Sequence, residues 1–330
     1  MVTIYDVAHQ AGVSASTVSR VINGKEYVRD STRVKVEKAI RKLQYVPNIP
    51  SFGVKGRELR AVGLLVPDIR YEHCARLAYS IENELSGHGY CCILCNSNND
   101  YEKAIHDMEL LIRHKVEGMV IVNSFYTESP IKNWLKDHPS SIPIVMSYGY
   151  LDLPNVYGVT IDIRDGIERL ISFFLKRGKR RLVFLQSRRE KGSSNQREVF
   201  EQIMQEKYGC QKPLTVQIEA LDMHMAYRAV KDIFEEHPLI EGVICDYSLV
   251  AVCVCHYCED AGIDIPGSMG VCATDKISYS EILRPALTCM DNKLEMIGRE
   301  SARTMIDLLN GVERSRRLML CGDIIERETV

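Results

Sequence analysis

From residue 61 onward, short apolar runs alternate with segments of helical length. The first runs are AVGLLVPD, CCILCN, GMVIVN and PIVMSY, separated by helix-length segments near 73–87, 101–114 and 129–137. A second series follows with GVTID, RLVFLQ, TVQIEA, GVICD and GVCAT. Apolar strands that alternate with helices form parallel sheets covered on both faces. Two such series predict two doubly wound lobes, with a ligand site in a cleft at the carboxyl ends of the strands.

The first 46 residues have a different pattern, which predicts three short helices. Thr3 followed by Asp6 indicates a capping box that opens the first helix, and Ser14 is placed to cap the second. Asp30 or Ser31 is placed to cap the third helix. The apolar residues at helical spacing, which we expect to form a thin core, are Val7, Ala8, Ala11, Val18, Val21, Ile22, Val36, Ala39, Ile40 and Leu43.

Charge is unevenly distributed along the chain. Residues 1–60 hold 11 Lys and Arg against 5 Asp and Glu, a formal charge of +6. The whole chain carries −2, so residues 61–330 carry −8. A basic head on an acidic body indicates a polyanionic partner for the head.

Gly12 between two short helices, followed by a third helix, predicts a helix-turn-helix. In that motif the second helix lies in the major groove of DNA, with its N-terminal residues nearest the base edges. The short hydroxyls of Ser14, Thr17 and Ser19 allow a close approach to phosphates, and Arg20 is long enough to bind a guanine edge. The alternative interpretation is a solvated helix face with one arginine. It explains neither the charge asymmetry nor the spacing of the helices.

The segment TIYDVAHQAGVSASTVSRVINGKEYVRDSTRVKVEKAIRKLQYVPN closely resembles the head of the LacI/GalR family of bacterial transcriptional regulators. The segments VGLLVPDI, VEGMVIV, GIDIPGSMGVCATD, LRPALTCMDNKLEMIG and ARTMIDLLNG follow the order and spacing of that family's effector domain. The resemblance implies a small all-α helix-turn-helix head and an α/β, two-lobed effector domain like a periplasmic binding protein, with parallel doubly wound sheets. The implied parts are a head over 1–46, a hinge or linker over 47–60, and an effector-binding and dimerisation domain over 61–330, with lobe one near 61–160 and 292–320 and lobe two near 161–291 and 321–330.

The resemblance also implies which head residues touch DNA. The implied base contacts are Ala15, Ser16 and Arg20, and the implied phosphate contacts are Thr3, Tyr5, Ser14, Thr17, Ser19, Asn23, Tyr27 and Thr32. Ala15 and Ser16 occupy the positions that vary within the family and determine operator choice. With these two residues there, we expect sequence recognition to depend on contact with a thymine methyl group and on Arg20. Members of the family bind near-palindromic operators as dimers, which suits a head with a thin core.

The linker YVPNIPSFGVKG departs from the family's pattern, in which a hinge helix forms on DNA and inserts a leucine into the minor groove. Val54 occupies the position of the family's leucine, and Phe52 is the alternative residue for insertion into the minor groove. Lys55 is the third predicted minor-groove residue of the hinge. Gly53 costs about 1 kcal/mol inside a helix. A flexible tether that forms no helix therefore stays the alternative to a hinge helix.

By register with the family, the implied effector-binding residues are Tyr71, His73, Tyr148, Arg197, Asp246, Asp275 and Asn292. Arg197 and Asp275 together could hold a polyol through charge-assisted hydrogen bonds, or could form an ion pair with a structural role only. Thr274 replaces the family's aromatic residue. Because stacking aromatics are lost, an acidic sugar or a non-sugar metabolite is an alternative to an ordinary pyranose.

Other motifs predict neither a metal site nor catalysis. On a helix, the cysteines and histidine of CVCHYC (253–258) do not converge on one tetrahedral point, and small core residues are the better interpretation. The same interpretation applies to Cys91, Cys92 and Cys95 on a strand. No nucleophile–base spacing or phosphate loop is recognisable, so we expect neither catalytic residues nor a cofactor. We also expect no membrane segment, no signal peptide and a cytoplasmic location with free thiols.

The sequence therefore predicts a homodimeric DNA-binding regulator, a repressor, whose operator affinity is changed by a small molecule, of carbohydrate type, in the cleft. A cytoplasmic sugar-binding protein without DNA regulation and an enzyme on the same fold are the alternatives. The end of the chain, IIERETV, carries no leucine heptad, which favours a dimer over a tetramer.

Overall fold

The computed structural model consists of two compact units, Met1–Leu59 and Arg60–Val330, and each is described by itself. The structure describes residues 2–22, 28–43, 45, 60–127, 129–138, 142–188, 196–219 and 223–330. Among the predicted residues, Asn23, Tyr27, Phe52, Val54 and Lys55 lie outside these ranges, as does nearly all of the predicted linker.

The first unit contains the three predicted helices, α1 (Ile4–Ala11), α2 (Ala15–Ile22) and α3 (Asp30–Leu43). The capping box of α1 is confirmed. Asp6 N donates to Thr3 Oγ1 over 3.4 Å, and Thr3 N donates to Asp6 Oδ2 over 2.7 Å. Gly12 ends α1 with φ of 67°, in the left-handed region that glycine adopts most easily.

The second helix begins where the sequence predicts, because Thr17 N donates to Ser14 Oγ over 3.2 Å. The third helix differs slightly from expectation. Asp30 is its first residue and does not precede it, so the carboxylate lies in the first turn, where the helix dipole favours negative charge. The buried core of the unit is Val7, Ala8, Val18, Val21, Val36 and Ala39, with Ala11, Ile22, Ile40 and Leu43 partly buried against it.

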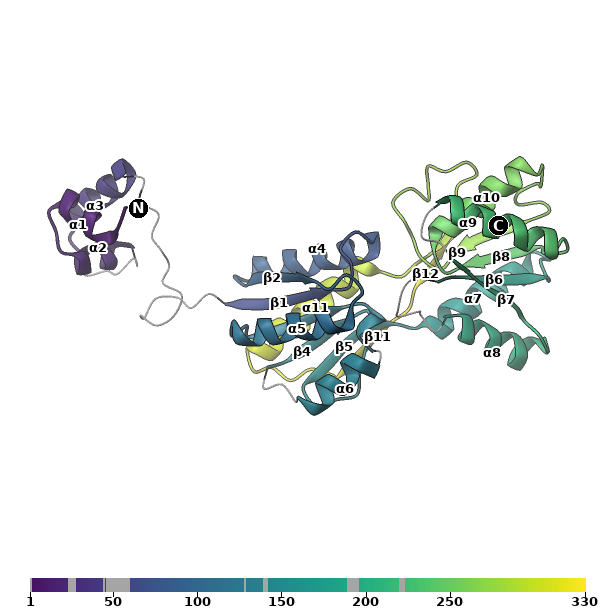
Figure 1. Cartoon of the computed structure of the whole chain (residues 1–330), viewed down its shortest axis with the longest axis horizontal. Helices are drawn as coiled ribbons and strands as arrows, with labels where there is room; N and C mark the ends of the chain where they lie inside the picture. Colours follow the sequence, from purple (N-terminus) through teal and green to yellow (C-terminus); the bar gives the residue numbers. More distant parts are fainter. Residues whose placement is uncertain are drawn as a thin grey trace. The chain divides into compact units, whose positions relative to one another are not determined.

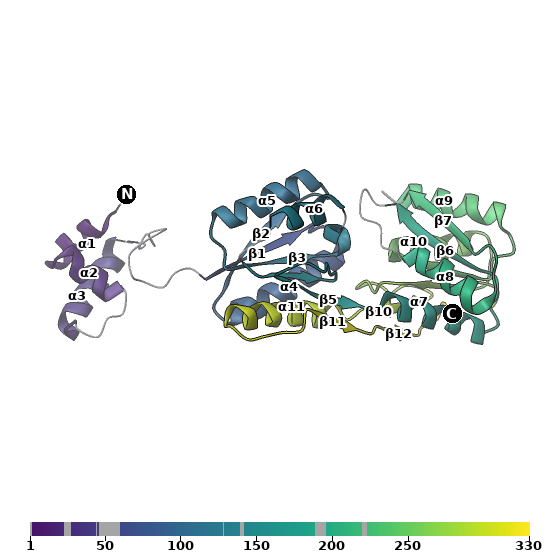
Figure 2. The same ribbon diagram turned by 90° about the horizontal axis from the view of Figure 1, so that it is seen from below.

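Lobe one of the second unit contains a six-stranded parallel sheet in the order β11-β5-β4-β3-β1-β2 (Figure 1). Its strands are β1 (Ala61–Val66), β2 (Cys91–Asn96), β3 (Gly118–Val122), β4 (Ile144–Ser147), β5 (Val156–Ile161) and β11 (Arg317–Leu320). Helices α4 (Glu72–Gly87) and α11 (Leu294–Leu309) cover one face, and α5 (Tyr101–Arg113) and α6 (Ser129–Asp137) cover the other (Figure 2). The short 3-10 helix η1 (Ser124–Thr127) follows β3.

One strand that the alternation groups with the second series lies in the sheet of lobe one, where the boundary near residue 160 implied by the family resemblance also places most of it. The run GVTID belongs to β5, which pairs in parallel with β4 and β11 in the sheet of lobe one. The connection from β4 to β5 contains no helix. The alternation of strands and helices therefore does not indicate to which of the two sheets β5 belongs.

Lobe two contains a second six-stranded sheet in the order β12-β10-β9-β8-β6-β7, parallel except for β12. Its strands are β6 (Leu182–Arg188), β7 (Leu214–Glu219), β8 (Gly242–Cys245), β9 (Gly270–Ala273), β10 (Thr288–Asp291) and β12 (Asp323–Ile325). Helices α7 (Ile163–Lys176) and α8 (Gln196–Tyr208) pack on one face, and α9 (Met223–Glu236) and α10 (Ser248–Asp260) on the other.

The chain passes between the lobes three times, from β5 to α7, from β10 to α11 and from β11 to β12. Each lobe is therefore assembled from separate stretches of sequence. Within the part of the chain that the structure describes, no helix has the length and apolar character needed to cross a bilayer.

The cysteines of the CVCHYC segment have the core role predicted for them: Cys253 and Cys258 are buried in lobe two, and Cys255 is partly buried there. The prediction is wrong for Cys91, whose side chain is exposed on β2, the edge strand of its sheet. Among the described residues, no three His, Cys, Asp or Glu side chains are grouped so that they could hold a metal ion.

Candidate DNA-binding face and ligand cleft

Helix α2 presents one face to the core of the first unit and another to solvent. Val18 and Val21 are buried, whereas Ser16 and Arg20 are exposed. Ser16 and Arg20 are four residues apart, so their side chains are neighbours on the same exposed face. Ala15, half-buried, is the first residue of the helix. These three residues, the predicted base contacts, thus lie at or near the solvent face of one short helix.

A cluster of hydroxyls lies at the N-terminus of α2. Ser14 Oγ is 2.9 Å from Ser16 Oγ and 2.9 Å from Thr17 Oγ1. The amide groups of a helix N-terminus favour a bound anion, and short hydroxyls add donors there without bulk. The predicted phosphate contacts Ser14 and Thr17 are therefore placed beside a helix end that favours phosphate.

The other predicted phosphate contacts are spread over the same unit. Tyr5 is 73% exposed in the first turn of α1, an unusual degree of exposure for an aromatic side chain. Thr3 is exposed, and Ser19 and Thr32 are half-buried. The hydrogen bond from the Thr3 side chain lowers the pKa of the Asp6 carboxyl at the start of α1.

A cleft opens between the two lobes of the second unit, with about 800 Å³ of space that no atom fills, part of it continuous with the surrounding solvent. Its described lining residues are His73, Arg76, Asn123, Ser124, Tyr148, Ser187, Gln196, Asp246, Thr274, Asp275, Lys276, Asp291, Asn292 and Leu294. Five of these directly follow the last residue of a parallel strand, namely Asn123, Tyr148, Asp246, Thr274 and Asn292. The cleft therefore lies at the carboxyl ends of the strands, as the alternation predicts.

The lobe-one wall of the cleft is built around His73 and Tyr148. Asn123 Nδ2 lies 2.5 Å from His73 Nε2, and the ring of Tyr71 is parallel to that of His73 with 6.1 Å between centroids. Tyr148 has φ of 68°, a conformation that costs free energy for a tyrosine and is typical of functional sites. Desolvation, together with the negative charge of Asp275, raises the pKa of Tyr148, so its hydroxyl stays protonated and able to donate.

The lobe-two wall holds two carboxylates in fixed positions. Asp246 Oδ1 accepts a hydrogen bond from Ser187 N over 2.8 Å. Asp275 Oδ1 accepts one from Ser248 Oγ over 2.6 Å, and Ser248 is fully buried at the start of α10. A carboxylate oriented in this way is a suitable acceptor for the hydroxyl groups of a ligand.

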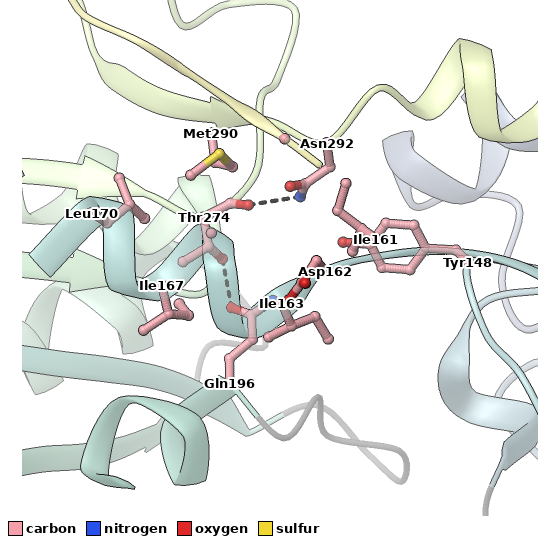
Figure 3. A pocket seen from close by; sticks show the side chains of 12 residues that line it. Tyr148, Ile161, Asp162, Ile163, Ile167, Leu170, Gln196, Thr274, Met290 and Asn292 are labelled. Atoms are coloured by element: carbon pink, nitrogen blue, oxygen red, sulfur yellow. Dashed lines mark hydrogen bonds between the residues drawn. The ribbon is translucent and has the colours of Figure 1, made fainter. Parts of the chain in front are cut away.

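Gln196 and Thr274 line the cleft although neither was among the predicted effector-binding residues. Thr274 was identified only as the residue that replaces the family's aromatic residue. Thr274 Oγ1 donates to Gln196 Oε1 over 2.7 Å, and Asn292 Nδ2 donates to the backbone carbonyl of Thr274 over 2.8 Å (Figure 3). These bonds connect α8 with the ends of β9 and β10. The position of Thr274 directly after a strand was the signal that could have identified it.

Arg197 is placed differently from the other predicted effector contacts. It lies on α8 with Nε 3.8 Å from Glu201 Oε1, and among the described residues that Nε is buried without a hydrogen-bond partner. The described lining of the cleft includes its neighbour Gln196 but neither Arg197 nor Tyr71. The structure thus brings together His73, Tyr148, Asp246, Asp275 and Asn292 from the predicted set.

The lobes are also joined by direct hydrogen bonds, which we call the interlobe clasp (Glu72, Arg76, Lys276 and Ser278). Glu72 Oε1 on α4 accepts from Ser278 N over 2.9 Å and from Ser278 Oγ over 2.7 Å. Arg76 Nη1 donates to the backbone carbonyl of Lys276 over 2.8 Å. The loop that follows β9 and carries Asp275 is thereby attached to lobe one.

Comparison with known proteins gives matches to both units. The family model described as "Bacterial regulatory proteins, lacI family" matches residues 3–48, and the model described as "Periplasmic binding protein-like domain" matches residues 171–330. The chain is 27% identical to catabolite control protein A of Priestia megaterium, over 94% of this chain and 93% of that protein. It is 27% identical to the HTH-type transcriptional repressor PurR of Haemophilus influenzae, over 100% of this chain and 99% of that protein.

Among solved structures, the chain is similar to the Lac repressor dimer bound to operator and the anti-inducer ONPF. The TM-score is 0.86, with 18% sequence identity, 99% of this chain covered and 98% of that one. At this level of identity the likeness establishes the fold, a helix-turn-helix head followed by a two-lobed domain with parallel sheets.

Proposed function

Because the chain belongs to the LacI family of bacterial regulatory proteins and is a DNA-binding transcriptional regulator, we propose that it is a cytoplasmic repressor. It binds a near-palindromic operator as a homodimer, and a small molecule in the interlobe cleft changes its affinity for that operator. The relatives are named as regulators, and the Lac repressor dimer was solved on its operator.

The observation that carries the proposal is the exposed face of α2. Ser16 and Arg20 extend from a helix whose other side is fixed by buried valines, in a segment of chain with a charge of +6. A guanidinium on such a face can form two hydrogen bonds to one guanine, worth about 1–3 kcal/mol of discrimination against other bases. The surrounding hydroxyls hold the helix in register through phosphates.

The cleft supplies the means of regulation. A ligand that contacts Asp275 on lobe two and His73 on lobe one binds most tightly at one angle between the lobes. Binding therefore shifts the population of dimers toward that angle, which changes the separation of the two heads and their fit to two half-sites. The oriented carboxylates and the protonated Tyr148 favour a polyhydroxylated ligand of carbohydrate type.

The DNA-binding proposal is tested with two variants that each remove one positive charge from the head. A duplex selected from a random library by the wild type is titrated in fluorescence anisotropy with Arg20→Ala and with Arg41→Ala. Arg41 is exposed in the last turn of α3, a different helix from the predicted recognition helix. Both variants should bind more weakly at all sequences, through lost attraction to phosphates. Only Arg20→Ala should lose the preference for the selected sequence, and an unchanged preference would refute the recognition helix.

A further inference from the structure

A second, smaller cavity adjoins the cleft. It contains about 300 Å³ of space that no atom fills, part of it continuous with the solvent, and it shares Tyr148, Gln196, Thr274 and Asn292 with the cleft. Beyond these shared residues the lining consists of Asp162, Gly322 and a group of apolar residues, which we call the apolar notch: Ile161, Ile163, Gly166, Ile167, Leu170 and Met290 (Figure 3).

The polar side chains of this cavity are those shared with the cleft and Asp162, whose Oδ1 accepts a hydrogen bond from Asp165 N over 2.9 Å at the start of α7. Gln196 Oε1 and Asn292 Nδ2 are both engaged with Thr274. Ile167, Leu170 and Met290 are buried side chains of the lobe-two core. A water or hydroxyl placed against these three side chains would lack hydrogen-bond partners, so the notch favours an apolar occupant. Its interior admits a group about the size of a methyl.

Gly166 gives an independent indication that the notch has to stay open. It lies inside α7, where glycine is less favourable than alanine by about 1 kcal/mol. Steric crowding does not require it. A Cβ built on Gly166 would have Met290 Cε as its nearest neighbour at 3.7 Å, an ordinary van der Waals contact. An alanine would therefore fit, but its methyl group would occupy part of the notch.

We propose that the apolar notch binds a methyl-sized group of the effector. The effector is then a polyhydroxylated ring that carries such a group, of the deoxysugar or methyl glycoside class, with its hydroxyls on the cleft carboxylates. The inference rests on the proposed carbohydrate-type ligand and specifies its chemistry. Filling a small apolar site with a methyl group discriminates between ligands by roughly 10–200-fold.

The test uses matched ligand pairs and the full-length protein in isothermal titration calorimetry. The deoxysugar pairs are L-fucose with L-galactose and L-rhamnose with L-mannose. The glycoside pairs are the methyl α- and β-D-glucosides and galactosides with the free sugars. We expect at least one methyl-bearing member to bind about 10-fold or more tightly than its partner. Whether that member comes from the first or the second set identifies the source of the methyl group.

The variant Gly166→Ala should abolish this preference while the hydroxylated partner binds as before, and its melting temperature should not fall. Gly87→Ala is the matched control. It makes the same substitution near the end of α4, where nothing lies within 4 Å of the added Cβ. If the hydroxylated partners bind as tightly as the methyl-bearing members, the proposal that the notch binds a methyl group is refuted, while the proposal of a carbohydrate-type ligand stands. No binding by any member would reject the carbohydrate class and the notch with it.

Discussion

The interlobe clasp makes a quantitative prediction for Glu72→Ala. Glu72 Oε1 accepts two hydrogen bonds from Ser278, and its side chain is 30% exposed. A hydrogen bond to a charged group is worth ~1.5–3 kcal/mol when buried, and solvent screening reduces the two bonds here to about 1–2 kcal/mol in total. This is a factor of about 5–30 in the equilibrium between attached and detached loop.

Hydrogen exchange measures this equilibrium directly, because the amide of Ser278 is one of the two donors. In the variant, protection of the peptide that contains Ser278 should fall by about 5–30-fold. The core strands of both lobes should keep their protection, since the clasp lies outside the sheets.

The control variant is Glu84→Ala. Glu84 Oε1 on α4 accepts from Arg303 Nε on α11 over 3.0 Å, and both residues belong to lobe one and lie outside the clasp. Exchange at Ser278 should therefore be unchanged. Protection in Glu72→Ala that stays within about twofold of the wild type, below the 5–30-fold expected, would show that these hydrogen bonds do not hold the lobes together.

Two further predictions concern stability. The hydrogen bonds from Arg70 lower the pKa of Asp68 from its ordinary value of 3.8, so their stabilisation is complete above about pH 4 and is lost as pH falls through the lowered pKa. Arg70→Met should reduce the urea midpoint more at pH 7 than near pH 2, and an effect independent of pH would contradict this account. Gly158→Ala should cost about 1–3 kcal/mol or more, because its Cβ would lie 2.5 Å from the backbone oxygen of Gly149. A melting temperature equal to that of Gly87→Ala would contradict the expected clash.

Local patterns were sufficient to predict most elements of the fold. Helices α1 to α3 follow from caps and apolar spacing, and strands β1 to β9 follow from the nine short apolar runs, whereas β10, β11 and β12 correspond to no predicted run. The alternation alone did not indicate the lobe of β5, because parallel neighbours normally need a long crossover and β5 joins β4 in parallel without an intervening helix. The boundary near residue 160, which places most of β5 in lobe one, came from the family resemblance. Assignment of a strand to a sheet depends on tertiary packing that periodicity does not report.

The cleft was predictable in its location and only partly in its residues. Asp246, Asp275 and Tyr148 follow strand ends and were identified by register with the family. Gln196 and Arg76 lie on helices and reach the cleft only because of how those helices dock. Arg197, one residue after Gln196, is held beside Glu201 instead. Successive residues on a helix point about 100° apart, so register alone does not decide which of the two faces the ligand.

The three passages between the lobes also determine when each lobe is complete during synthesis. The apolar face of α4 packs on α11, and the two helices approach closely where Gly298 faces Ser80. Arg76 and Glu295, which join the same helices, are 219 residues apart in the chain. A nascent lobe one therefore leaves the ribosome with one face of its sheet covered by α4 alone, and α11 completes that face only after nearly all of lobe two has emerged. The part of the sensor translated first is among the last to become native.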